Sequence, residues 1–188
     1  MTRFSWHGYE VEVDKTATSA WYAEAEDWGC ACGRCRNFLT LARERRLPGE
    51  ILEILDRLSV PPARATYVCE LYHDKNWKEK GLLYQFSWRI GGAVLAVPPG
   101  ENGPGWGPLI ERPWGGLVLG HEDYPYGAPD FPKQNFDLEC QIWLPWVLDE
   151  PVAGDDSLSR NPDLCPVLLD GTCGLRLFRG AICVHRIH

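Results

Sequence analysis

The chain has 188 residues, a net charge of −7 and 45% hydrophobic residues. This composition excludes a disordered chain, and the length suits one domain with a packed core. The excess of acidic over basic residues opposes a nucleic-acid partner, because phosphate binding needs a basic surface. No signal peptide is visible, and no apolar stretch approaches the roughly 18 residues of a membrane span. We therefore expect a cytoplasmic protein without membrane contact, whose eight cysteines stay reduced.

The first third of the chain predicts one strand and then two helices. Residues 9–14 alternate between apolar and acidic side chains, which is the period of a half-buried strand. Apolar side chains recur at helical spacing from residue 35 and again from residue 51. Pro48 suits the first turn of the second helix, and Val60-Pro61-Pro62 ends it. The sequence thus predicts a helical hairpin within residues 35–58.

Strands are predicted to take over after the hairpin. The clearest alternation in the chain runs from Leu82 to Ile90. The pair Gly91-Gly92 suits a tight hairpin turn, because glycine readily adopts positive φ angles. The predicted strands of this half are 67–73, 82–90, 93–97, 116–120, 138–144 and a C-terminal hairpin within 175–187.

The order of these elements predicts the fold class. Two stretches near 98–116 and 121–136 are rich in Pro and Gly and are predicted to be loops. Strands joined by turns, with the helices in one early segment, indicate a single α+β domain over residues 1–188. We expect a mainly antiparallel sheet with the helical hairpin packed on one face. A parallel nucleotide-binding fold is not expected, because strands and helices do not alternate.

Three cysteines lie within six residues just before the first predicted helix: Cys30, Cys32 and Cys35. Structural zinc takes four ligands in a tetrahedron, and these thiols would supply three of them. The three cysteines are therefore candidate metal ligands, with zinc as the candidate cofactor. The candidates for the fourth ligand are Cys69, His73, Cys183 and His185.

Two other interpretations of the cluster stay open. Cys32 and Cys35 also have the spacing of a dithiol redox motif, at a helix start that favours a thiolate. A thioredoxin-like arrangement needs a buried strand directly before the motif, and residues 23–27 are mostly Ala and acidic residues instead. The more ordinary account is that the cysteines are small packing residues or tolerated free thiols at a helix start.

Two short segments carry a resemblance to other proteins. Residues 32–38, with the sequence CGRCRNF, and residues 144–148, with the sequence LPWVL, resemble segments of a group of small uncharacterised bacterial proteins. The resemblance covers most of the chain, including the helical hairpin. It implies a bacterial cytoplasmic protein, and it brings no established activity and no catalytic residues.

The sequence favours a binding protein over an enzyme. A nucleophile elbow, a phosphate-binding loop and a paired-histidine metal motif are all missing, so no catalytic residue is predicted. Nine tryptophans and the Pro/Gly-rich loops favour a non-enzymatic domain that binds a protein or a small ligand through an aromatic-rich surface. Trp77, Trp106 and Trp114 are expected around a concavity. The alternative is a zinc-binding or thiol redox protein that uses the cysteine cluster.

Overall fold

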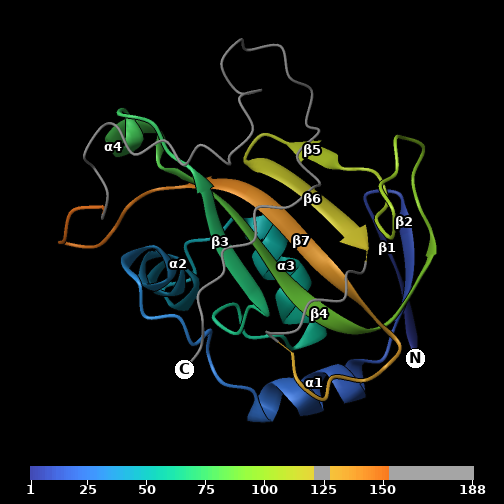
Figure 1. The fold of residues 1–188 in the computed structure, drawn as a ribbon. Helices are drawn as coiled ribbons and strands as arrows, with labels where there is room; N and C mark the ends of the chain where they lie inside the picture. The colour runs from blue at the N-terminus through green and yellow to red at the C-terminus, as the bar shows by residue number, and fades with distance from the viewer. Residues whose placement is uncertain (121–127, 153–188) are drawn as a thin grey trace.

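The structure is a computed structural model, and it describes residues 1–120 and 128–152. In these residues, seven strands form one sheet in the order β1-β2-β4-β7-β6-β5, and β3 pairs with β4 outside this path. All pairings are antiparallel, and helices accompany the sheet (Figure 1), so the predicted α+β class is confirmed. The elements are β1 (Thr2–Trp6), β2 (Tyr9–Val13), α1 (Lys15–Glu24), α2 (Gly33–Arg43), α3 (Gly49–Leu58), β3 (Tyr67–Tyr72), α4 (Trp77–Lys80), β4 (Leu82–Ala96), β5 (Ile110–Arg112), β6 (Gly115–Gly120) and β7 (Asn135–Leu144).

One face of the sheet is apolar and forms the core with α2 and α3. Alternate side chains of β4 and β7 point to this face, because successive residues of a strand face opposite ways. The ring of Phe38 in α2 packs against the ring of Phe86 in β4, with centroids 4.8 Å apart. Ile51 and Leu55 of α3 are fully buried in the same cluster, and α3 lies behind the central strands in Figure 1. The fully or almost fully buried side chains of this sheet face include Leu82, Tyr84, Phe86, Trp88, Ile90, Leu138, Cys140 and Ile142.

Part of the opposite face of β4 and β7 is polar and nevertheless buried. Arg89 donates to both carboxylate oxygens of Asp137, with N–O distances of 3.0 and 3.1 Å. The Arg89 side chain is 8% exposed and that of Asp137 is 0% exposed. Glu139 and Gln141 follow on the same face and are also buried. The two faces of this sheet therefore differ in chemistry, and the polar side chains from Asp137 to Gln141 are shielded from water like the apolar ones.

The predicted hairpin turn at Gly91-Gly92 is wrong, because β4 runs unbroken through both residues. Gly92 has a φ of 137°, and a Cβ built on it would lie 2.0 Å from the carbonyl oxygen of Glu12 in β2. The N–H of Gly91 donates to Oγ1 of Thr18 in α1, over 3.0 Å. The two glycines thus let β2 and the start of α1 approach β4 closely. Glycine within a strand often marks such a close approach of another backbone segment.

Four elements were not predicted: β1, α1, α4 and β5. Helix α1 buries only Thr18 and Tyr22, so its apolar period is too weak to reveal a helix. Hydrogen bonds stabilise this helix instead. The Asp14 carboxylate caps its first turn by accepting from the N–H of Ala17 at 2.9 Å. The hydroxyl of Tyr22 donates to the carbonyl oxygen of Arg89 in β4 at 3.0 Å. The helices were expected mainly within 35–58, but α1 precedes this segment and α4 follows it.

The loop predictions need two changes. Strand β5 lies inside the stretch 98–116, and β7 begins at Asn135, inside the stretch 121–136. The predicted hairpin within 175–187 and residues 121–127 lie outside the described residues. No helix in the described ranges has both the length and the apolar character needed to cross a membrane.

Candidate metal centre

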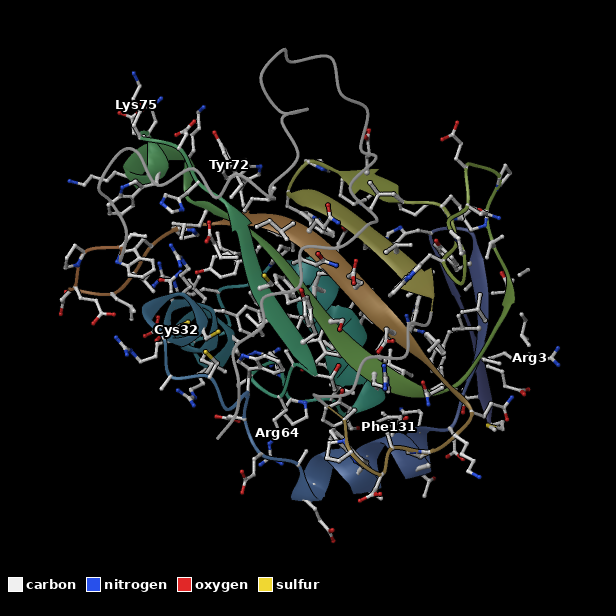
Figure 2. The ribbon with its side chains drawn as sticks, in the orientation of Figure 1. Arg3, Cys32, Arg64, Tyr72, Lys75 and Phe131 are labelled. Carbon is white, nitrogen blue, oxygen red and sulfur yellow. The ribbon has the colours of Figure 1, made fainter. Side chains whose placement is uncertain are left out.

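The start of helix α2 brings the three predicted cysteines together. Cys32 is the N-cap residue, and its Sγ accepts a hydrogen bond from the backbone N–H of Cys35 at 3.5 Å. Because the chain turns into the helix at this cap, Cys30 lies beside the first helical turn. The three Sγ atoms all lie within 4.8 Å of one another. Figure 2 shows the sulfur atoms gathered beside α2 around Cys32.

The three thiols differ in their surroundings. Cys35 is buried at 7% exposure, whereas Cys30 and Cys32 are partly exposed. The indole Nε1 of Trp28 donates a hydrogen bond to Sγ of Cys35 at 3.3 Å. All five cysteines in the described part of the chain are free thiols. The cluster therefore has one side in the core and one side that an ion can reach.

Crowding and burial shape the protonation of the cluster. The hydrogen bond with Cys32, burial, and the charges of Cys32 and Cys30 together raise the pKa of the Cys35 thiol far above its ordinary value. Without a cation, the cluster therefore keeps the Cys35 proton. A divalent cation has the opposite effect, because it stabilises thiolates and displaces their protons. The arrangement is thus suited to metal binding coupled to proton release.

The candidates for a fourth ligand do not join the group. Cys69 pairs with Gln85 on the polar face of the sheet, whereas α2 packs on the apolar face. Nδ1 of His73 lies 2.9 Å from a carboxylate oxygen of Glu70, and His73 is outside the cysteine group. Cys183 and His185 lie outside the described residues. The described residues therefore supply three ligands, Cys30, Cys32 and Cys35.

A strap formed by residues 145–150 covers the beginning of α2. A Cβ at Gly33 would lie 3.3 Å from the Trp146 ring and 2.8 Å from a carboxylate oxygen of Glu150, so only glycine fits there without a shift. Arg36 forms an ion pair with Glu150. The indole Nε1 of Trp146 donates to the carbonyl oxygen of Glu150 at 2.7 Å. The segments CGRCRNF and LPWVL, distant in sequence, therefore lie against each other.

Of the three tryptophans expected around a concavity, two are buried and one lines a groove. Trp77 and Trp106 are each only 8% exposed. Trp114 is partly buried and lines an open groove of about 680 Å³, together with Trp143. Trp143 is 41% exposed, and its ring meets Tyr72 edge-to-face with centroids 6.2 Å apart. Sequence reasoning missed Trp143, although the alternation of β7 places it opposite its buried neighbours.

The wall of this groove is fixed by a carboxylate. Glu50 of α3 accepts from Nε of Arg112 at 3.0 Å and from the indole Nε1 of Trp114 at 2.8 Å. Hydrogen bonds from Arg112 and Trp114 hold the pKa of Glu50 below its ordinary value. The Trp114 indole is thus hydrogen-bonded to a carboxylate that also forms an ion pair with Arg112.

Comparison of the chain with protein-family models finds no match, and comparisons with curated proteins and with solved structures find none either. The fold and the cluster alone therefore define the class of this protein. It is an α+β protein with three cysteines gathered at the start of a helix.

Proposed function

We propose that this protein is a zinc-binding domain whose ion is held by Cys30, Cys32 and Cys35. The observation that carries the proposal is the distance of at most 4.8 Å between their sulfur atoms. Zn–S bonds of about 2.3 Å in a tetrahedron separate sulfurs by roughly 3.8 Å, so small side-chain movements suffice to bind the ion. A fourth position is left for water, a ligand or a residue outside the described ranges.

The ion would act as a structural clip. The cluster lies where α2 begins, and α2 packs on the sheet through Phe38 and contacts the strap through Arg36. A metal that ties Cys30 to the first helical turn restricts the chain that enters the core, and structural zinc contributes directly to folding. The free thiols suit a reducing compartment such as the cytoplasm.

The thiol redox alternative has less support. In the described residues, α1 and an irregular segment precede α2, so Cys32 does not follow the buried strand of a thioredoxin-like motif. The raised pKa of Cys35 also opposes its use as a nucleophile, because the thiolate is the reactive form. Cys32 remains the thiol to be tested.

Cobalt(II) titration of the reduced protein tests the proposal. We expect one ion per chain, with thiolate charge-transfer bands and the intense visible bands of a tetrahedral site, and zinc should displace the cobalt. Cys30→Ser, Cys32→Ser and Cys35→Ser should each weaken binding strongly. Cys69→Ala is the matched control, since Cys69 lies on the other sheet face, and it should bind like the wild type. Absence of uptake together with unusually fast alkylation of Cys32 contradicts the metal site and favours the redox alternative.

A second candidate function is binding of a partner or small ligand at the aromatic groove. The observation that favours it is the exposed edge-to-face pair of Tyr72 and Trp143 beside a groove that Trp114 also lines. Exposed aromatic side chains at a groove are typical of binding surfaces. An aromatic sulfonate dye should bind there and fluoresce, and Trp143→Ala should abolish the signal. A dye response that is unchanged in Trp143→Ala contradicts this function for the groove.

A further inference from the structure

The thiols at the start of α2 differ from the other described cysteines in their access to solvent. Cys30 and Cys32 are partly exposed, whereas Cys35 is 7% exposed. In the rest of the described chain, Cys69 and Cys140 are buried, at 4% and 1% exposure. Oxidants react with thiolates that they can reach. An oxidant that arrives from solvent therefore meets Cys30 and Cys32 first among these five thiols.

Cys32 and Cys35 are also placed as the two halves of a disulfide. Cys32 is the N-cap of α2 and Cys35 is its third helical residue, so three positions separate them. This span of an α-helix sets a Cα–Cα distance of about 5 Å, and disulfides need roughly 4.4–6.8 Å. The N–H of Cys35 donates to Sγ of Cys32 at 3.5 Å, and the two sulfurs lie within 4.8 Å of each other. Changes in side-chain torsion angles therefore suffice to bring the sulfurs to bonding distance.

The helix does not fix Cys30 in the same way. Cys30 lies two residues before the N-cap and thus outside the first helical turn, beside which Figure 2 shows the sulfur atoms gathered. Its distance from either partner depends on an irregular segment of backbone. The pair of Cys32 and Cys35 is therefore the one that the local structure prepares for a bond.

We propose that Cys32 and Cys35 form a reversible disulfide that regulates the metal site. This regulation rests on the proposed function, because the same two thiols are two of the three zinc ligands. Joined to each other, they no longer donate thiolates, and Cys30 remains as the one ligand of the cluster. A structural zinc site takes four ligands, so oxidation releases the ion.

A peroxide is the class of oxidant that this reaction needs. The Cys32 thiolate attacks one oxygen of hydrogen peroxide, the O–O bond breaks and hydroxide leaves, which converts Cys32 to a sulfenic acid. The Cys35 thiolate then attacks the Cys32 sulfur and displaces a second hydroxide. In total, two thiolates, one hydrogen peroxide and two protons give one disulfide and two waters, and two electrons pass from sulfur to oxygen. A small thiol reverses the reaction by two exchange steps and becomes a disulfide itself.

Peroxide treatment of the zinc-loaded, full-length protein tests this regulation. A chromophoric chelator reports zinc release relative to the untreated protein, and peptide mass spectrometry after alkylation locates the disulfide. We expect the ion to be released as Cys32 becomes linked to Cys35, and dithiothreitol should restore zinc binding. Cys69→Ala, at a buried thiol on the other sheet face, is the matched control and should behave like the wild type. A protein that never takes up zinc overturns the proposed function and this regulation with it, whereas zinc retained in excess peroxide overturns the regulation alone.

Metal-free variants give a result that does not depend on zinc. In Cys35→Ser, the sulfenic acid of Cys32 loses its partner and should be trapped by dimedone. In Cys30→Ser, the disulfide between Cys32 and Cys35 should form as in the wild type. Circular dichroism confirms that each variant is folded. A wild-type disulfide that joins Cys30, or a cysteine outside the cluster, in place of this pair overturns the proposal.

Discussion

The side chain of Asn37 and the backbone N–H of Val147, 110 residues apart, are joined by a hydrogen bond of 2.7 Å. The amide nitrogen of Asn37 also donates to the carbonyl oxygen of Pro145 at 3.0 Å. Asn37 is fully buried in α2, five positions after the N-cap cysteine. A single amide thus fixes the 145–150 strap onto the helix that carries the cysteine cluster.

Asn37→Ala tests this connection. We expect it to lower the free energy of unfolding by about 1–3 kcal/mol, because it leaves buried backbone groups of the strap without partners. Urea denaturation measures the change. Asn102→Ala, at an exposed position, should change stability by no more than about 0.5 kcal/mol. If the two variants are equally stable, Asn37 does not hold the strap.

Trp28→Phe should weaken zinc binding roughly tenfold to a hundredfold, the usual effect of removing a hydrogen bond to a metal ligand. The reason is the loss of the indole N–H that contacts Sγ of Cys35 at 3.3 Å. Competition against a chromophoric chelator gives the affinity. Trp21→Phe is the control, since the Trp21 indole donates to the carbonyl oxygen of Pro129 instead. An unchanged affinity in Trp28→Phe would show that this hydrogen bond does not orient the thiol.

Gly92→Ala should destabilise the protein by about 2–4 kcal/mol, because a side chain there is strained at its φ of 137° and meets the carbonyl oxygen of Glu12. Thermal unfolding measures the loss. Gly29→Ala is the matched substitution, since a Cβ at Gly29 meets no atom within 4 Å. It should be nearly neutral. If Gly92→Ala is as stable as Gly29→Ala, the close approach of β2 to β4 is contradicted.

Asp137→Ala should cost about 3–5 kcal/mol, because it removes the buried carboxylate that pairs with the buried charge of Arg89. Glu12→Ala breaks the exposed pair with Arg3, whose side chain is 75% exposed, and should cost at most about 1 kcal/mol. Urea denaturation of both variants gives the comparison. A small effect at Asp137 would mean that water reaches this face of the sheet.

The metal-free protein should lose stability above about pH 9. Burial raises the pKa of the Cys140 thiol and of the Tyr84 hydroxyl, and crowding raises that of Cys35, from ordinary values of 9.0, 10.0 and 9.0. In the unfolded chain these groups ionise at their ordinary values, so the folded state binds more protons at alkaline pH and becomes less favoured. Urea midpoints measured from neutral to alkaline pH should fall, and bound zinc should reduce the fall. A flat profile contradicts these raised pKa values.

The predictable part of the fold came from local periodicity. The alternation in β2, β3 and β7 and the helical spacing in α2 and α3 predicted these elements, because each pattern reflects burial of one face. Helix α1 escaped prediction because two hydrogen bonds with β4 hold it, one that Thr18 accepts from the N–H of Gly91 and one that Tyr22 donates to the carbonyl oxygen of Arg89, and such contacts leave no apolar period. The gathering of Cys30, Cys32 and Cys35 was predictable for the same local reason, since the three residues flank one helix start.

The sequence by itself determined the fold class, the helical hairpin and the position of the cysteine cluster, since these depend on residues near one another in the chain. Only the tertiary structure decided that Gly91-Gly92 lies inside a strand, because glycine serves a turn and a close approach equally well. It also decided that Cys69 lies on the other sheet face from the cluster, and that Asn37 meets Val147. Those relationships depend on strand pairing and packing between distant segments, and no local pattern of side chains encodes them.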